Sequence, residues 1–432
     1  MFNAATAPTT LPALSWDTVL SPHIYVFYAA FILSFCFTPI MRMVAIYYGI
    51  IDEPDQVRKL HAAPVAYLGG VAVFVGWIAG LAMGQLHIPQ AEIGAPHLQV
   101  KLNIVLGACV ILILGLWDDV QRLRPRNKIL GQVIAAIILL KGGVGSHCLD
   151  PLFNPLNHDL INTFGPHCYL PHPIIDLLSW GLVVAMVVGC CNATNLMDGL
   201  DGLCGGVTAV IAAGFLFLAV QLAMLSLEPD WDAVRIVLAL SLLGAVLGFV
   251  PYNFNPASIF MGDAGSMFLG FSCATLIILL AQEQSKWLLA ALVMFALPIL
   301  DTSLAFVRRW VNRRPLFSAD RHHFHHQLVD RGFSIRMTVV ISYGLTICFC
   351  LLGMFIAYMR TRYAIAFYLV IFGSLIVAAY KMGLVHEKKP VASPKTLRST
   401  GAIIQGKIDP ESSVVEVPEP AKTPEPEETR VS

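Results

Sequence analysis

Acidic residues lie at the ends of several long apolar runs in this chain. Asp118 and Asp119 end one run, Asn195 and the following acids end another, and Asp263 precedes a third. Carboxylate and amide oxygens are the ligands that Mg²⁺ prefers, usually one or two protein carboxylates together with substrate phosphates. These residues therefore predict a site for a hard divalent cation and a phosphate, with Mg²⁺ as the expected metal and Mn²⁺ as an alternative.

Basic residues and histidines occur in the same predicted loops and can neutralise phosphate charge. The candidates are Lys59, His61, Lys128, Arg321, His323, His325 and His326. Gly69-Gly70 begins an apolar run, and backbone N–H groups at such a helix start can bind phosphate oxygens. The histidines alone would suggest Zn²⁺, but the acids are more numerous and no cysteine accompanies the histidines.

Each motif also has an ordinary structural interpretation. An acid pair at the end of a span can anchor it at the interface, Asp198-Gly199 can form a turn, and Asp263 can cap a helix. The functional interpretation is favoured because all of these motifs fall on the same predicted side of the membrane. The loops on the other side show nothing comparable.

The elements that position these residues are transmembrane helices. Of the 432 residues, 56% are hydrophobic and 13% are charged, about half the charged share of a soluble protein. A span needs about 20 mostly apolar residues. Eleven runs qualify, of which 127–145 is the weakest: 23–43, 67–86, 101–117, 127–145, 173–191, 203–224, 234–251, 265–282, 286–306, 337–358 and 363–382. The sequence predicts an all-α polytopic membrane protein with about eleven transmembrane helices.

The distribution of basic residues predicts the orientation. With the N-terminus outside, 22 of the 28 lysines and arginines fall on the inner side, as the positive-inside rule requires. We expect an external leader at 1–22, without the basic region of a cleavable signal, a transmembrane catalytic domain at 23–382 and a disordered cytoplasmic tail at 383–432. The zero net charge gives no nucleic-acid signature.

The long outer loop, 146–172, contains Cys148 and Cys168, which could pair in an oxidising compartment. The same loop holds four histidines: His147, His158, His167 and His172. We favour scattered surface histidines over a metal site there.

A transporter is the main rival class, because transporters place charged groups near the middle of the membrane. Here almost every charge lies at the end of a span, and the exception is Asp301. A single buried acid can instead support the structure or a neighbouring site, so a carrier remains only an alternative.

Two sequence blocks carry a family resemblance. They read Asn192-x-x-Asn195-x-x-Asp198-Gly-Leu-Asp201-Gly and Phe260-Met-Gly-Asp263-x-Gly-Ser266. From about Asp52 to Arg331 the chain resembles the polyprenyl-phosphate N-acetylhexosamine-1-phosphate transferases. This family includes the bacterial enzymes that begin O-antigen and teichoic acid, and the muramoyl-pentapeptide transferase of peptidoglycan synthesis.

Two features are similar to the N-acetylglucosamine branch of this family. One is Arg58-Lys59-x-His61 followed by Gly69-Gly70, and the other is Asp320-Arg321-x-His323-x-His325-His326. The muramoyl branch typically has three consecutive histidines, whereas Phe324 interrupts the run here. The spacing between Pro54 and Arg58 is one residue longer than the branch pattern, a departure that bears on the placement of Arg58 and Lys59.

The resemblance implies transfer of N-acetylglucosamine 1-phosphate from UDP-N-acetylglucosamine to a polyprenyl phosphate of the undecaprenyl type. The products are polyprenyl-diphospho-N-acetylglucosamine and UMP, and the step would initiate a cell-envelope polysaccharide. It also implies an eleven-span protein of the bacterial cytoplasmic membrane, with its site on the cytoplasmic loops and the lipid bilayer as its surroundings. Another UDP-hexosamine or UDP-muramoyl-pentapeptide is an alternative donor, and a homodimer is an open alternative.

The resemblance also implies a role for each site residue. Asn195 and Asp263 correspond to metal ligands, and Asp118 and Asp119 to the catalytic acid pair, with direct attack favoured over an aspartyl-phosphate intermediate. Asp198 and Asp201 would shape the nucleotide and metal environment, and would share one face if their segment is helical. The remaining residues would bind phosphate or sugar: Lys59, His61, Lys128, Arg321, His323, His325 and His326.

Overall fold

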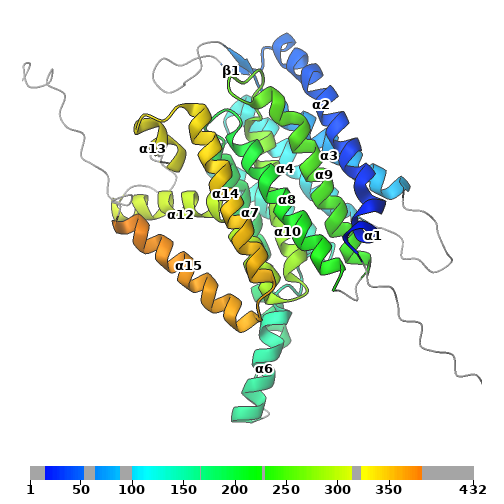
Figure 1. Ribbon diagram of the computed structural model, residues 1–432, viewed down its shortest axis with the longest axis vertical. Helices are drawn as coiled ribbons and strands as arrows, with labels where there is room; N and C mark the ends of the chain where they lie inside the picture. Colours follow the sequence, from blue (N-terminus) through cyan, green and yellow to red (C-terminus); the bar gives the residue numbers. More distant parts are fainter. Residues whose placement is uncertain are drawn as a thin grey trace, which may run out of the picture. The chain divides into compact units, whose positions relative to one another are not determined.

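The computed structural model describes residues 15–52, 64–87, 100–165, 167–225, 229–313 and 323–381. These residues are almost entirely helical (Figure 1). The helices are α1 Trp16–Leu20, η1 Ser21–His23, α2 Ile24–Tyr47, α3 Gly69–His87, α4 Leu102–Gln121, α5 Pro125–Lys141, α6 Asp150–Phe164, α7 His172–Met197, α8 Leu203–Ala223, α9 Pro229–Asn253, α10 Gly262–Ala281, α11 Ser285–Met294, α12 Ala296–Val311, α13 Phe324–Asp330, α14 Ile335–Ala357 and α15 Thr361–Lys381.

Helix α10 forms the centre of the bundle. Every residue from Ala264 to Ala281 is buried, and α10 contacts α3, α4, α7, α8, α9 and α11. Close approach depends on glycine: a Cβ on Gly70 would lie 2.2 Å from the backbone nitrogen of Gly265, and a Cβ on Gly115 would lie 2.3 Å from Cα of Ala264. The starts of α3 and α10 and the end of α4 are therefore packed backbone against backbone.

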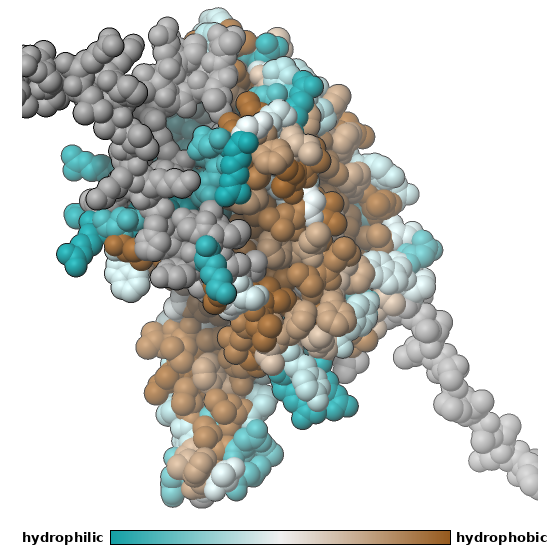
Figure 2. Space-filling model, turned by 60° about the vertical axis from the view of Figure 1, so that its left-hand side comes forward, coloured by the Kyte–Doolittle hydropathy of each residue, from teal (hydrophilic) through white to brown (hydrophobic). Residues whose placement is uncertain are grey.

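Large apolar side chains cover the outside of the bundle. Helix α2 exposes Ile32 and Ile46, and α14 exposes Leu351 and Phe355. Figure 2 shows a broad apolar surface between more polar ends. A protein that presents this much apolar surface outside a packed core is solvated by lipid rather than by water, so the chain is a multi-pass membrane protein.

The described residues contain eight helices that are long and apolar enough to span, or nine if the bent pair α11–α12 is one span. The expected count of eleven also includes α5 and α15. Helix α5 has 17 residues, or about 26 Å at 1.5 Å per residue, which is short against about 30 Å of hydrocarbon. Every predicted run is therefore helical, run 286–306 as the two helices α11 and α12, but the count of eleven stays a prediction.

The predicted run 286–306 is broken by a sharp bend. Helices α11 and α12 meet at Phe295 at an angle of 74°, and α12 lies across the direction of α14 in Figure 1. Pro298, in the first turn of α12, has no N–H to continue the hydrogen bonds of α11. The bend turns α12 toward α13.

Three local features differ from the sequence predictions. Ile51–Asp52 (β1) and Val65–Ala66 (β2) pair as a short antiparallel ladder. The outer segment that was expected to be a loop contains α6, and helical structure begins at Trp16, inside the expected leader.

The two cysteines of the outer segment, Cys148 and Cys168, are not paired: Cys148 is buried and Cys168 is exposed. Burial raises the pKa of the Cys148 thiol to about 11, as for an inert core cysteine.

Arg235 is a buried charge that joins α9 to α10. It is fully buried, and it donates to Asp232 and Glu283 at 2.8 Å and to the carbonyl of Leu279 at 3.0 Å. Both acids and the carbonyl satisfy the guanidinium, which would otherwise be strongly unfavourable in an apolar interior. This triad holds the end of the bundle opposite Asn253, where α9 terminates.

Candidate active site

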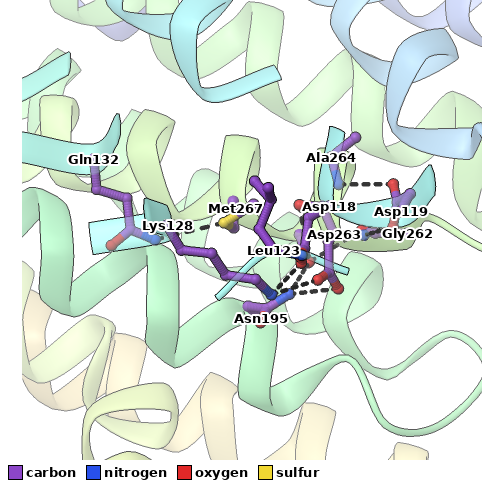
Figure 3. A network of polar contacts seen from close by, with 11 residues as sticks. Asp118, Asp119, Leu123, Lys128, Gln132, Asn195, Gly262, Asp263, Ala264 and Met267 are labelled. Atoms are coloured by element: carbon purple, nitrogen blue, oxygen red, sulfur yellow. Dashed lines mark hydrogen bonds and ion pairs between the residues drawn. The ribbon is translucent and has the colours of Figure 1, made fainter. Parts of the chain in front are cut away.

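The ends of four helices bring the predicted acids together. Asp118 and Asp119 lie in the last turn of α4, Lys128 in the first turn of α5, Asn195 near the end of α7 and Asp263 in the first turn of α10 (Figure 3). An acid in the first turn of α10 is favoured by the helix dipole, whereas two acids in the last turn of α4 oppose it. The unfavourable position of the α4 pair points to function rather than helix stability.

Lys128 lies between two of these acids. Its Nζ contacts Oδ2 of Asp118 and lies 2.8 Å from Oδ2 of Asp263. The other oxygen of Asp118 accepts the N–H of Leu123 at 2.6 Å, which orients the carboxylate toward Lys128. Asp118, Lys128 and Asp263 therefore form one ion-pair network that joins α4, α5 and α10.

Asp119 has a different role from its neighbour. Its Oδ1 accepts the backbone N–H of Asp263 at 2.7 Å, and its Oδ2 accepts that of Ala264 at 3.1 Å. It therefore caps the start of α10 from a neighbouring helix, satisfying N–H groups that have no partner within the helix. Gly262 makes this possible, because it has φ +74° and a Cβ there would lie 2.7 Å from Oδ2 of Asp119. The two residues of the predicted catalytic pair therefore have different roles. Asp118 contacts Lys128, whereas Asp119 positions Asp263.

Asn195 holds the other side of Asp263. Its Nδ2 donates to Oδ1 of Asp263 at 2.8 Å and to Oγ of Ser266 at 3.0 Å. The amide nitrogen, rather than Oδ1, therefore faces the carboxylate, and a half-turn of the amide would present the oxygen instead. Ser266 is a site residue that the sequence does not single out, although it belongs to the Phe260–Ser266 block.

The pKa of Asp198, which directly follows α7, depends on its burial and on the neighbouring acids. Burial, followed by the charges of Asp263, Asp119 and Asp201, raises the pKa of its carboxyl to about 8. Three acids (Asp118, Asp119 and Asp263) gather around one lysine, so in their ionised form they carry excess negative charge, and their carboxylates offer oxygen donors. This donor set fits a hard divalent cation.

Replacing Asp198 by asparagine should raise the melting temperature of the metal-free protein, and by more at pH 8 than at pH 5. The folded-state pKa of about 8 lies above the value of about 3.9 in an unfolded chain, so the folded protein retains a proton that the unfolded chain has lost. The contribution of Asp198 to the free energy of unfolding therefore falls as pH rises from about 4 to about 8. Asparagine resembles the protonated acid and removes this decline. Thermal melts in chelator measure it, and an identical pH dependence in both proteins would contradict the assignment.

Asp201 faces away from this cluster. Its Oδ2 accepts from Nδ2 of Asn255 at 2.9 Å and from the N–H of Ala257 at 3.1 Å. The segment 198–202 is a turn between α7 and α8, so the condition for Asp198 and Asp201 to share a helix face, a helical segment, is not met. Asp201 instead anchors the loop that leads to α10.

The predicted histidines gather around α13. His323 lies 3.0 Å from Asp301 through Nδ1, and the ring centroids of His325 and His326 are 4.4 Å apart. His325 is 2% exposed, and a Cβ on Gly199 would lie 2.5 Å from its Nε2. Because Gly199 follows Asp198, one turn contacts both the histidine group and the acid cluster.

The glycines at the start of α3 do not offer N–H groups to a ligand. Gly69 and Gly70 donate to the carbonyls of Phe260 and Met261 at 3.0 and 2.9 Å, so that expectation is wrong. The same segment contributes a residue that the sequence did not indicate. The pKa of the Tyr67 hydroxyl is raised by burial and by the charges of Asp52, Asp119 and Asp263, which places a neutral hydroxyl beside the acids.

Lys59, His61 and Arg321 lie outside the described residues. The strands before and after the segment with Lys59 and His61 are paired, with Asp52 opposite Val65. Ala66 in turn bridges Ile259, just before α10. The two flanking strands therefore lie next to the segment that leads into α10.

The outer histidines are separate from this site. His147 lies 3.1 Å from Asp176 and 3.6 Å from Asp150, and among the described residues this trio is the group of acids and histidines close enough to share a metal. His158 pairs locally with Asn162. Polar contacts of one exposed histidine with two acids account for the trio, so we assign no metal there.

Comparison with known proteins agrees with this arrangement. Residues 102–281, from α4 to α10, match the model of glycosyl transferase family 4. The chain is 31% identical over 357 residues, 81% of its own length and 89% of the relative, to a probable undecaprenyl-phosphate N-acetylglucosaminyl 1-phosphate transferase of Bacillus subtilis. It is 33% identical to a decaprenyl-phosphate N-acetylglucosaminephosphotransferase of Mycobacterium tuberculosis, covering 73% of this chain and 77% of the relative.

A phospho-N-acetylmuramoyl-pentapeptide-transferase of Bacillus cytotoxicus is 29% identical, covering 75% of this chain and 93% of the relative. The matched family region contains Asp118, Lys128, Asn195 and Asp263, the four side chains that meet in the structure. With this match, these relatives and the shared site, the chain belongs to glycosyl transferase family 4, as a polyprenyl-phosphate N-acetylhexosamine-1-phosphate transferase.

Proposed function

We propose that the protein transfers N-acetylglucosamine 1-phosphate from UDP-N-acetylglucosamine to a polyprenyl phosphate, releasing UMP and initiating a cell-envelope polysaccharide. The observation that carries the proposal is the junction of Asp118, Lys128, Asn195 and Asp263 at the ends of four helices. The names of the relatives support the substrates, because they combine a polyprenyl phosphate with N-acetylglucosamine phosphate.

The reaction brings two anions together, since a lipid phosphate must attack a diphosphate. The second pKa of a phosphate monoester is about 6, so the nucleophile is already largely ionised at neutral pH. The protein must therefore supply positive charge and alignment more than a strong base. Lys128 provides a half-buried ammonium between Asp118 and Asp263, where it can meet a phosphate oxygen.

The acids would hold Mg²⁺, with Asp263 and Asn195 as ligands and Asp118 and Asp198 beside them. The metal would supply Lewis-acid stabilisation of the diphosphate charge. Asp119 fixes the start of α10 through two backbone N–H groups and so sets the position of Asp263. Mn²⁺ has similar ligand preferences and is the alternative metal.

N-acetylglucosamine is the favoured sugar. The relatives named for this sugar are 31% and 33% identical to the chain, against 29% for the muramoyl-pentapeptide relative. Phe324 supports the same branch, because it interrupts the histidine run and lies at the start of α13. Another UDP-hexosamine or UDP-muramoyl-pentapeptide is the competing donor.

The site would face the cytoplasm, where UDP-sugars are made. The positive-inside distribution supports an external N-terminus and a cytoplasmic tail in the bacterial inner membrane. The structure brings the ends of α4 and α7 and the starts of α5 and α10 together (Figure 3), which agrees with their loops lying on one side of the membrane. Helix α5 is essential to this topology, because without it Lys128 and Asn195 would lie on opposite sides.

The proposal is tested by incubating purified protein with Mg²⁺, polyprenyl phosphate and, separately, UDP-N-acetylglucosamine, UDP-N-acetylgalactosamine and UDP-muramoyl-pentapeptide. Mass spectrometry of the lipid fraction should show polyprenyl-diphospho-N-acetylglucosamine, with little product from the other donors. Product from only one of the other donors would show that the protein uses that sugar instead of N-acetylglucosamine. Absence of product with every donor would favour a carrier.

A further inference from the structure

A buried carboxylate of the bent span contacts the start of α13. Asp301 and His323 are each 5% exposed. One oxygen of Asp301 lies 3.0 Å from Nδ1 of His323, and the other accepts the backbone N–H of Phe324 at 2.7 Å. Both oxygens of a single side chain therefore hold two consecutive residues.

This contact determines which ring nitrogen of His323 is available. An ionised carboxylate can only accept hydrogen bonds, so Nδ1 carries the proton that it donates to Asp301. Nε2 is then the nitrogen left for another partner, and a carboxylate at Nδ1 increases the basicity of the ring and fixes its orientation. The arrangement is that of a histidine oriented by a buried acid.

The same contact fixes where the other histidines lie. Phe324 is the first residue of α13, and its bound N–H holds the helix against α12. The ring of His325 is parallel to that of His323, with an interplanar angle of 5°. Nε2 of His325 is buried beside Gly199, and among the described residues it has no hydrogen-bond partner. A buried nitrogen without a partner, next to the Asp198-Gly199 turn, points to a group supplied by a ligand.

His325 reaches that turn as a neutral ring. Burial lowers its pKa to about 3, so at neutral pH it offers a neutral ring to a polar group rather than a charge. The ring of His326 packs against it at an interplanar angle of 49°, and Asp301 is the acid that contacts this group of rings from α12.

We propose that Asp301 is a positioning residue for the sugar nucleotide: it orients His323 and fixes α13 so that the three histidines meet the sugar 1-phosphate part of the donor. The inference rests on the proposed function for the identity of the donor. The proposal also gives the bend at Phe295 a structural role, because the bend turns α12, and with it Asp301, toward α13.

The kinetic test compares Asp301→Asn, Asp301→Glu, His323→Ala and the Asp301→Asn/His323→Ala double variant. For Asp301→Asn we expect kcat/KM for UDP-N-acetylglucosamine to fall by about 10- to 100-fold, with an unchanged KM for polyprenyl phosphate, and we expect Asp301→Glu to restore part of the loss. The double variant should be no slower than His323→Ala alone. Losses that multiply in the double variant would overturn the proposal, because Asp301 would then act independently of His323.

Asp232→Asn is the matched control for lost stability. Asp232 is also a buried acid with an ion pair, but its partner is Arg235. Both lie near the start of α9, at the end of the bundle opposite Asn253. We expect this variant to melt at a lower temperature and to keep the parent kcat/KM. An equal kinetic loss in Asp232→Asn would show that the Asp301 effect is general destabilisation.

Hydrogen exchange of α13 separates this inference from the proposed function. The amide of Phe324 should exchange at least about ten times faster in Asp301→Asn than in the parent, since its acceptor is weakened, while the amides of α10 should be unchanged. An unchanged rate at Phe324 would overturn the contact, whatever the substrate. If Phe324 exchanges faster in the variant but the parent protein is inactive toward UDP-N-acetylglucosamine, then the contact of Asp301 is supported and the proposed donor is wrong.

Discussion

Replacing Asp263 by asparagine is expected to abolish metal-dependent UMP release, by at least about 1,000-fold, while the protein stays folded. Asp263 is the acid that touches most of the site: Lys128 and Asn195 bind its oxygens at 2.8 Å. Asparagine has the same shape but removes the charge that these donors, and the proposed Mg²⁺, require. UMP release at saturating Mg²⁺ is the measurement, with melting temperature in detergent as the check on folding.

The matched control is again Asp232→Asn, a buried acid outside the site. It should melt lower than Asp263→Asn yet retain UMP release. Normal turnover in Asp263→Asn would reject the metal assignment. Restoration of its turnover by high Mg²⁺ would instead show that the variant has weakened metal binding without removing it.

Asp118→Asn is expected to reduce turnover by about 100-fold, by the same factor from pH 6.5 to pH 9. The structure ties Asp118 to Lys128 and to the N–H of Leu123, which is the arrangement of a group that orients a cation. The lipid phosphate has already lost most of its protons in this range, so a base adds little. The ratio of parent to variant kcat across pH is the measurement.

Lys128→Met completes this comparison. If Asp118 acts by orienting Lys128, then Asp118→Asn/Lys128→Met should be no slower than Lys128→Met alone. A loss in Asp118→Asn that shrinks as pH rises would contradict the orienting role, and would indicate that Asp118 removes a proton. A trapped phosphorylated Asp118 would support covalent chemistry instead.

The meeting of Asp118, Lys128, Asn195 and Asp263 could be predicted from the sequence. Each lies at an end of an apolar run, and the alternation of spans places those ends on one side of the membrane. Helices that pack in a bundle bring such ends within reach of one another. The pattern of spans and charges therefore contains most of the site.

The roles within the site could not be predicted in the same way. Asp119 follows Asp118 directly, yet it caps α10 because Gly262 allows that helix start to approach. Asp201 matches Asp198 in its Asp-Gly setting, yet it anchors Asn255. These differences arise from side-chain directions at helix ends, which depend on packing between distant segments.

The contact between Asp301 and His323 was also outside the reach of sequence reasoning. The sequence identifies Asp301 as an acid within a span, but its partner depends on the 74° bend between α11 and α12. A proline alone does not specify the direction of a bend. Tyr67 gave no signal either, because a single aromatic residue beside a short strand is ordinary.

The central claim is that a phosphosugar, rather than a sugar, moves from the nucleotide to the lipid. Donor labelled in the β-phosphate of UDP-N-acetylglucosamine tests it most directly, with polyprenyl phosphate, Mg²⁺ and the purified protein. The β-phosphate label should appear in the lipid product, with unlabelled UMP released in equal amount. Label retained in released UDP would contradict the account, because the bond broken would then lie between the sugar and the diphosphate.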